Sequence, residues 1–169
     1  MKDSTVKRKR PSQKRLELLD RLSLAIRASQ NTSEAFDEHV AAAVGINRTD
    51  LRCLDILGQH GPITAGQLAD LMHLSGGAIT TLVDRLERAG YARRTRDTVD
   101  RRRVLVELEP GAVERAFPYY EPLFHGTVRL LENHTDEELE LFIDFLVKGR
   151  EMVEQELEKL ERGAPAGDE

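Results

Sequence analysis

Residues 64–108 most constrain the fold, because they combine two short amphipathic helices, a tight turn and an arginine-rich hairpin in about forty-five residues. Thr64 and Gln67 have the spacing of a capping box, and Ser75 has N-cap chemistry before the second helix. Apolar residues of the second helix recur at i, i+3, i+4 and i+7: Ile79, Leu82, Val83 and Leu86. Gly90 suits the left-handed position after a helix. Two helices joined by so few residues predict a helix-turn-helix.

The other face of the second helix has a composition that helix propensity does not explain. It begins with Gly76 and Gly77, and a glycine in a helix costs about 1 kcal/mol relative to alanine. Small residues let a helix N-terminus approach phosphates and base edges, where the helix dipole favours anions. Threonine and arginine side chains contact bases in a major groove. The sequence predicts a DNA-reading face, with a solvated helix surface as the alternative: Ser75, Gly76, Gly77, Thr80, Thr81 and Arg85.

A charged hairpin follows this helix. Tyr91–Arg94 and Arg103–Leu108 have the character of strands, and Thr95–Arg102 is the polar loop between them. The segment 84–103 holds eight arginines against four acidic residues, a balance of +4 in a chain of net charge −5. Arginine suits a narrow minor groove, where the negative potential is enhanced. The hairpin is therefore predicted to contact DNA, with a merely solvated charged hairpin as the alternative: Arg94, Arg96, Asp100, Arg101 and Arg102.

The run LSGGAITTLVDRLERAGYARR, followed by DTVDRRRVLVEL, resembles the core signature of the MarR family of winged-helix regulators. The resemblance implies that Ser75 to Arg85 reads the major groove, and that Asp100 and Arg102 form the Asp-x-Arg of the wing tip. It implies a mainly α fold, a winged helix-turn-helix with a small β wing and long N- and C-terminal dimerisation helices. The sequence departs from the family at Glu109-Pro110-Gly111, where members often place a threonine before the next helix.

Length and composition limit the remaining possibilities. The chain has 169 residues, 40% of them hydrophobic, and no apolar run approaches the roughly 18 residues that cross a membrane. A single cysteine excludes an intrachain disulfide and, with no signal peptide in the sequence, indicates a cytoplasmic protein. The sequence predicts five segments: a basic, disordered arm over 1–15, helical dimerisation arms over 16–46 and 110–161, the DNA-binding module over 47–109, and a disordered tail over 162–169.

The predicted arms favour a homodimer over a monomer with frayed arms. Thr135 and Glu138 have capping-box spacing and open a last helix of some 25 residues, about 37 Å long. Much of its apolar stripe lies beyond so small a core, and a second copy of the chain would bury it. The resemblance also implies a dimer. Two wings related by a two-fold axis predict double-stranded DNA with a pseudo-palindromic operator, its half-sites roughly 10 bp apart.

The resemblance implies that a small molecule, often phenolic, changes DNA affinity by binding between the arms and the winged helix. Aromatic and histidine side chains on the predicted arms are candidates for the wall of this ligand pocket: Phe36, His39, Phe117, Tyr120, Phe124 and His125. The alternative is that these side chains form ordinary core, because aromatic residues at helical spacing usually pack against neighbours.

Two other kinds of sensor are alternatives to ligand binding. Cys53 is a candidate redox switch, but its place in LRCLDIL favours an inert, partly buried thiol. The histidines lie scattered without HxxxH or CxxC pairing, so the sequence predicts neither metal nor cofactor.

The sequence favours a transcriptional regulator, and a repressor over an activator. A winged-helix module that binds proteins without specific DNA binding is the alternative. An enzyme is disfavoured, because no nucleophile elbow or phosphate loop is present.

Overall fold

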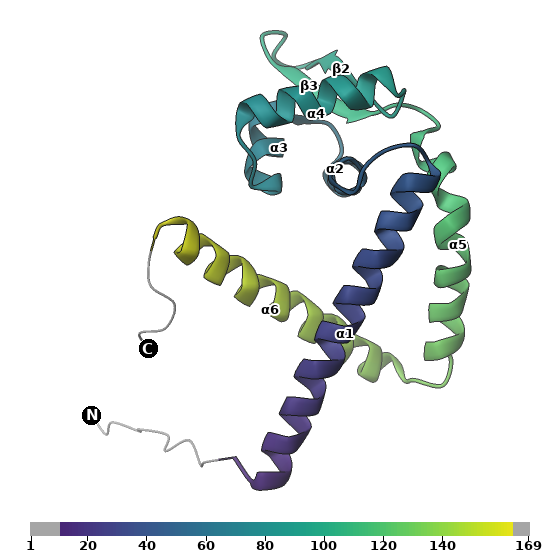
Figure 1. Ribbon diagram of the computed structural model, residues 1–169, viewed down its shortest axis with the longest axis vertical. Helices are drawn as coiled ribbons and strands as arrows, with labels where there is room; N and C mark the ends of the chain where they lie inside the picture. Colours follow the sequence, from purple (N-terminus) through teal and green to yellow (C-terminus); the bar gives the residue numbers. More distant parts are fainter. Residues whose placement is uncertain (1–10, 164–169) are drawn as a thin grey trace. The chain divides into compact units, whose positions relative to one another are not determined.

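The computed structural model describes residues 11–163. Long helices lie toward both ends of this range, and short helices with a small sheet lie between them (Figure 1). The elements in chain order are α1 Gln13–Ala43, α2 Arg48–His60, β1 Ile63–Thr64, α3 Ala65–Met72, α4 Gly76–Arg88, β2 Ala92–Arg96, β3 Val104–Leu108, α5 Ala112–Leu131 and α6 Asp136–Glu161. This is the predicted mainly α fold with a β wing.

The described residues form two compact units. The first extends to Tyr119 and holds α1 to β3 with the beginning of α5. The second starts at Tyr120 and holds the remainder of α5 with α6. The predicted arm 16–46 therefore shares a unit with the predicted module 47–109, and the predicted arm 110–161 is divided between the two units.

The core of the first unit lies within the winged helix. Its buried residues come from every element between α2 and the start of α5: Cys53, Leu57, Ile63, Leu68, Met72, Ile79, Leu82, Val83, Leu86, Tyr91, Ala92, Val106 and Ala112. The four apolar residues predicted for α4 are all in this set, so the predicted stripe is confirmed. Capping boxes begin α2 at Asn47 and α3 at Thr64, and Ser75 caps α4. Gly90 has φ 72°, as a left-handed residue after a helix requires.

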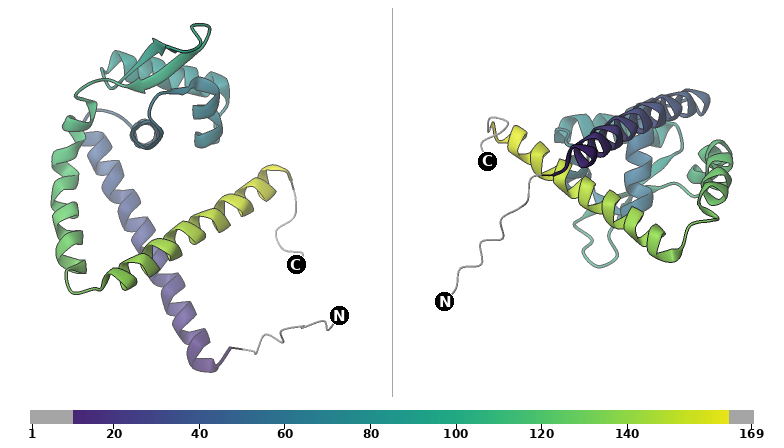
Figure 2. Two further views of the ribbon diagram at one scale, coloured as in Figure 1. Left: turned by 180° about the vertical axis from the view of Figure 1, so that it is seen from behind. Right: turned by 90° about the horizontal axis from the view of Figure 1, so that it is seen from below.

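The wing is a three-stranded antiparallel sheet in the order β1-β3-β2. Ala92 pairs with Leu108 and Arg96 pairs with Val104, so the hairpin register covers all five residues of each strand. The two-residue strand β1 was not predicted from the sequence, and it pairs Ile63 with Val106. The loop between β2 and β3 extends away from α4, as seen from the front in Figure 1 and from behind in the left panel of Figure 2.

Helix α1 begins at Gln13, where Ser12 accepts a hydrogen bond from the Arg15 amide. The predicted disordered arm over 1–15 is therefore wrong for residues 13–15, and residues 1–10 lie outside the described part. At its other end, α1 is fixed to the winged helix: the Tyr91 hydroxyl donates to the Val44 carbonyl at 2.7 Å. Arg115 of α5 lies over the Tyr91 ring and donates to the Ala89 carbonyl at 3.0 Å.

Helix α6 opens with the predicted capping box, since Thr135 accepts from the Glu138 amide and Glu138 accepts from the Thr135 amide. No residue of this 26-residue helix is buried. Its larger apolar side chains are instead exposed: Leu141, Phe142, Ile143, Phe145, Leu146, Val147, Met152, Val153 and Leu160. An apolar surface of this extent is typical of a helix that packs against a partner. Of the predicted tail 162–169, only residues 162 and 163 are described.

Candidate DNA-binding interface

A tight turn between α3 and α4 presents the N-terminus of α4. His73 ends α3 in the left-handed region at φ 53°, and the Leu74 amide donates to the Ala69 carbonyl at 3.0 Å. Ser75 then accepts a hydrogen bond from the Ala78 amide at 3.3 Å. These contacts satisfy the ends of both helices and leave the first turn of α4 uncovered, with Ser75, Gly76 and Gly77 exposed.

No residue in the described part of the chain packs against the two glycines. A Cβ atom built on Gly76 or Gly77 would meet no atom within 4 Å, and neither residue has a positive φ. Alanine would therefore fit at either position of the isolated protein and would favour the helix. A surface that must approach another molecule closely accounts for glycine here.

The threonines of this face keep their hydroxyl protons on their own helix. Thr80 Oγ1 donates to the Gly76 carbonyl at 2.9 Å, and Thr81 Oγ1 donates to the Gly77 carbonyl at 3.1 Å. Both side chains are exposed, so each still offers its methyl group and the acceptor lone pairs of its oxygen. Methyl groups of this kind pack against the thymine methyl in a major groove.

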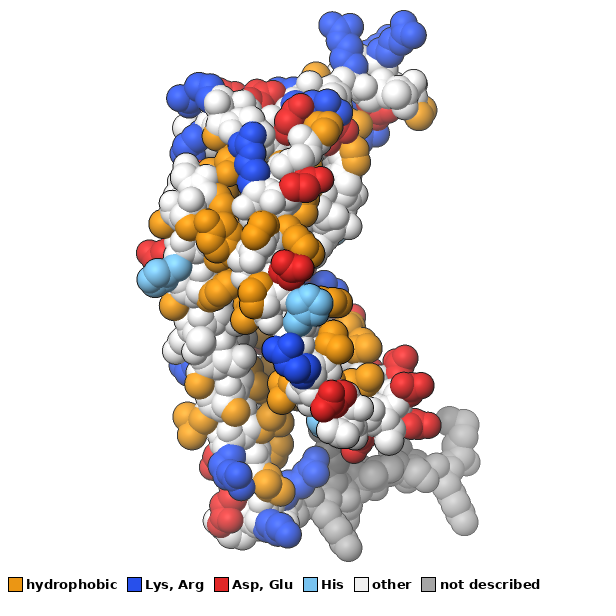
Figure 3. Space-filling view, turned by 90° about the vertical axis from the view of Figure 1, so that its right-hand side faces the viewer, with side chains coloured by type: hydrophobic (Ala, Val, Ile, Leu, Met, Phe, Trp, Pro, Cys, Tyr) orange, Lys and Arg blue, Asp and Glu red, His pale blue; other side chains and the backbone are white. Residues whose placement is uncertain are grey.

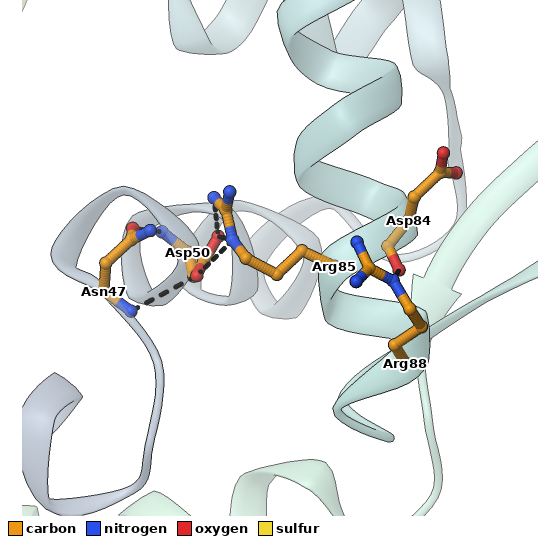
Figure 4. Close-up of polar contacts among 5 residues, drawn as sticks. All are labelled: Asn47, Asp50, Asp84, Arg85 and Arg88. Carbon is orange, nitrogen blue, oxygen red and sulfur yellow. Dashed lines mark hydrogen bonds and ion pairs between the residues drawn. The ribbon is translucent and has the colours of Figure 1, made fainter.

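Arg85 does not lie with these residues. Its guanidinium extends from α4 to the first turn of α2, where it binds the Asp50 carboxylate (Figure 4). The Nε–Oδ2 distance is 2.9 Å and the Nη2–Oδ1 distance is 2.5 Å. The base contact predicted for Arg85 stays a prediction, and within the protein the Nε and Nη2 donors of its guanidinium bind Asp50. This hydrogen bonding also raises the pKa of Arg85.

Arg94 is likewise occupied within the chain. Its guanidinium lies 2.7 Å from the Asp84 carboxylate and also binds Glu87, both on α4. Its backbone amide donates to Glu87 as well, at 2.8 Å. The structure therefore gives Arg94 a role in joining the wing to α4. Two further arginines of the basic segment also have acidic partners: Arg93 binds Glu107, and Arg103 lies 3.7 Å from Asp97.

The wing loop is organised by two aspartates that bind backbone amides. Asp97 accepts from the Val99 amide at 2.8 Å, and Asp100 accepts from the Arg102 amide at 3.0 Å. The hydrogen bond from Val99 lowers the pKa of Asp97. Both carboxylates stabilise the backbone of the loop, and Asp100 does so at Arg102 itself.

Three wing arginines have guanidinium groups without a partner in the described part of the chain. Within residues 11–163, Arg96, Arg101 and Arg102 form no side-chain hydrogen bond or ion pair, and all three are exposed. Figure 3 shows basic side chains projecting at the tip of the hairpin, at the top of that view. The structure thus separates the arginines that hold the fold together from those that remain available for phosphates or a groove.

The residues predicted to wall a ligand pocket lie on two helices. Phe36 and His39 are on α1 and Phe117 is on α5, all within the first unit. The other three belong to the second unit: Tyr120, Phe124 and His125. The rings of Phe124 and His125 meet edge to face at 5.7 Å. Phe117 and Phe124 are 53% and 64% exposed, so neither is ordinary core within its own unit.

A cavity that the sequence did not predict lies between α1 and α2. Its volume is about 370 Å³, and charged residues dominate its lining: Asp37, Arg48, Thr49, Leu51, Arg52 and Asp55. Burial, together with the nearby charge of Asp37, raises the pKa of Asp55. Such a lining suits polar groups of a ligand better than a phenolic ring.

Cys53 is fully buried in the core of the winged helix. Burial, with a smaller contribution from the Asp50 charge, raises the pKa of its thiol to about 12. The thiolate is the reactive form, so this environment disfavours the predicted alternative of a redox switch. Among the described residues, no three His, Cys, Asp or Glu side chains are grouped to bind a metal.

Comparisons with known proteins agree with this geometry. The MarR family model matches residues 46–104, the span from the cap of α2 to the start of β3. An uncharacterized HTH-type transcriptional regulator of Bacillus subtilis, YcgE, is 42% identical over 127 residues, which cover 75% of this chain and 82% of YcgE. The chain belongs to the MarR family. It is accordingly a DNA-binding transcriptional regulator with a winged helix-turn-helix.

Two further relatives extend the comparison. The HTH-type transcriptional repressor YetL of Bacillus subtilis is 27% identical over 111 residues, covering 64% of this chain and 66% of YetL. The solved structure of Streptococcus pneumoniae FabT in complex with DNA matches with a TM-score of 0.62 at 20% identity, covering 81% of this chain and 98% of FabT. At that identity the likeness shows the fold alone. Separately, the helices of residues 11–163 include none long and apolar enough to span a membrane.

Proposed function

We propose that this MarR-family regulator is a repressor that binds a pseudo-palindromic operator as a homodimer. In this proposal, the exposed first turns of α4 enter the major groove of each half-site. Ser75, Gly76, Gly77, Thr80 and Thr81 face the bases there. The observation that carries the proposal is the pair of open glycines at the start of α4, which have no packing role within residues 11–163.

The wing supplies the second contact. Arg96, Arg101 and Arg102 approach the backbone and the adjacent minor groove, since their guanidinium groups have no partner within residues 11–163. Asp100 supports this contact through the loop backbone. Arg85 and Arg94, which the sequence also suggested, are left out of the contact set because both are bound to carboxylates of the protein.

The homodimer is supported by the apolar side chains that α1, α5 and α6 leave exposed. Figure 3 shows such side chains at the surface. A second copy would bury them and would place two winged helices on one DNA duplex. Repression then follows from occupation of the operator. This function requires the compartment that holds DNA, consistent with the cytoplasmic location expected from the sequence, and it includes no catalytic step.

Relief by a small aromatic ligand remains part of the proposal. The candidate wall residues Phe36, His39, Phe117, Tyr120, Phe124 and His125 occur on α1 and α5, the helices next to the winged helix in the sequence. Ligand control requires different ligand affinity in the DNA-bound and free arrangements, typically by about 1–3 kcal/mol.

Fluorescence anisotropy with DNA from upstream of the protein's own gene tests the proposal, with scrambled DNA of the same length as the control. We expect preferential binding of the upstream DNA that persists when the salt concentration is raised. Equal and steeply salt-dependent binding of both duplexes would show phosphate contacts alone and contradict a sequence-reading role for this site. Absence of binding at low salt would favour the protein-interaction module.

A further inference from the structure

Asp50 is the one fully buried charged side chain among residues 11–163. It lies in the first turn of α2, and its side chain is 1% exposed. The MarR-family role of α4 does not by itself call for a carboxylate here. Burying a charge costs free energy unless the charge is paired and hydrogen-bonded, so Asp50 requires partners inside the protein.

Two sets of donors satisfy this carboxylate. Oδ2 accepts a hydrogen bond from the Asn47 amide at 3.2 Å, which closes the capping box of α2. Arg85 donates three hydrogen bonds, from Nε to both oxygens and from Nη2 to Oδ1. The guanidinium and carboxylate groups are planar, and a bidentate contact between them fixes their orientation as well as their distance. The first turn of α2 is thus joined to α4 across 35 residues of sequence.

A second ion pair holds α4 from its other side. Asp84 and Glu87, which flank Arg85, both bind Arg94 of β2. One turn of α4 is therefore attached to α2 through Arg85 and to the wing through Asp84 and Glu87. These attachments act with the buried apolar residues of α4 to hold the rotation of the helix about its axis. That rotation decides whether Gly77 and Thr81, which precede Arg85 by two turns and one turn on the same side of the helix, face DNA.

We propose that Asp50 and Arg85 are positioning residues for DNA recognition, which fix the rotation of α4 so that its glycine and threonine face meets the bases. Arg85 acts on DNA only through this pair. The inference rests on the proposed entry of α4 into the major groove. Asp50 holds the Nε–Nη2 edge of the guanidinium, and the inference assigns this positioning role to Arg85 in place of the direct base contact that the sequence suggested.

A double-mutant cycle separates these roles. The variants are Asp50→Asn, Arg85→Gln and the two combined. Asparagine keeps an oxygen for the Asn47 amide, so the cap of α2 survives. Arg88→Gln is the matched control, since Arg88 lies three residues further along α4 and, among residues 11–163, its side chain donates only to the carbonyl oxygen of Asp84 (Figure 4). It removes the same charge from the same helix without touching the pair.

The measured quantity is the ratio of affinities for two duplexes, determined at a temperature at which melting curves show each variant to be folded. One duplex is selected by the wild-type protein from a random-sequence pool, and the other is its scrambled version. We expect each single variant to lower this ratio by about tenfold, and the double variant to fall no further than the single ones. Arg88→Gln is expected to weaken binding to both duplexes alike and to leave the ratio unchanged.

Arg85→Lys guards against a folding defect, because it keeps a positive charge beside Asp50 but loses the planar fork. It should also lower the ratio. If the variants changed the melting temperature but not the ratio of affinities, the Asp50–Arg85 pair would only stabilise the fold, and the inference would be overturned. Arg85 would instead read a base if the Asp50→Asn variant kept the full affinity ratio while Arg85→Gln lost its preference at one base pair. If the wild-type protein selects no sequence, the proposed groove entry fails as well.

Discussion

The winged helix and helix α6 use apolar residues in opposite ways. In α4, four of 13 residues are buried, and they meet side chains from the neighbouring helices and strands. Helix α6 has twice the length, yet none of its 26 residues is buried. The winged helix therefore has a hydrophobic core of its own. In contrast, the apolar side chains of α6 are exposed in the described part of one chain. This difference is what the proposal expects if the winged helix supplies DNA recognition and α6 supplies association.

The largest expected effect comes from charging the surface of α6. Phe142→Glu with Leu146→Glu places two carboxylates in its apolar stripe, and we expect the dimer to dissociate. Operator affinity should fall by about 10²–10⁴-fold, because the second half-site contact is no longer intramolecular. Sedimentation and fluorescence anisotropy measure the two effects.

Glu151→Gln, on the same helix, is the control and should leave both measurements unchanged. A doubly charged variant that still sediments as two chains would contradict the assignment of association to α6.

A smaller loss is expected at the wing. Arg102→Ala removes an exposed guanidinium with no partner in the described chain, and operator binding should weaken by about 1–3 kcal/mol, with mass and melting unchanged. Arg93→Ala is the matched control on the same hairpin, because Arg93 is already bound to Glu107 at 2.8 Å. Equal losses for the two variants in anisotropy titrations would show that the distinction between paired and unpaired arginines has no meaning for binding.

Gly77→Ala should change stability and binding in opposite directions. The added methyl group meets no atom of the described residues, so the free energy of unfolding should rise by about 0.5–1 kcal/mol. Operator affinity should fall, because the methyl group would stand between α4 and the bases. Urea unfolding and anisotropy give the two values. Gly66→Ala on α3, where a Cβ meets only an ordinary contact at 3.9 Å, serves as the control. Unchanged operator affinity in Gly77→Ala would place the DNA on another face.

The smallest effect is expected at Cys53. The folded-state pKa of about 12 lies above the roughly 8.5 of an unfolded cysteine. Burial of the protonated thiol therefore contributes its full stability below about pH 8.5, and that contribution is lost as the pH rises toward 12. At pH 7 the native protein should resist iodoacetamide, and peroxide should leave operator affinity unchanged. Rapid native alkylation coupled to DNA release would revive the redox alternative.

Local signals in the sequence predicted the winged helix well. The caps at Thr64, Ser75 and Thr135 were all predicted and confirmed, because a cap is decided by residues three apart. The recognition of the MarR family through the wing and α4 was confirmed too. The two-residue strand β1 was missed, since it is too short to show an alternating pattern.

Two ion pairs at the site could not be predicted from the sequence. Arg85 stands at a position that suits a base contact, but its partner Asp50 lies 35 residues earlier, and no local pattern reveals that pair. Arg94 was assigned to DNA for the same reason, although α4 supplies two carboxylates to bind it. Charge counting identified a basic hairpin and gave no sign of which arginines are already bound.

The most direct test of the central claim is a hydroxyl-radical footprint of the full-length protein on the duplex that it selects from a random-sequence pool. Our account predicts two symmetric protected regions, centred about 10 bp apart, from two copies of α4 and two wings. A single protected region bound by one chain, or protection without symmetry, would contradict the division between a recognising winged helix and an associating α6.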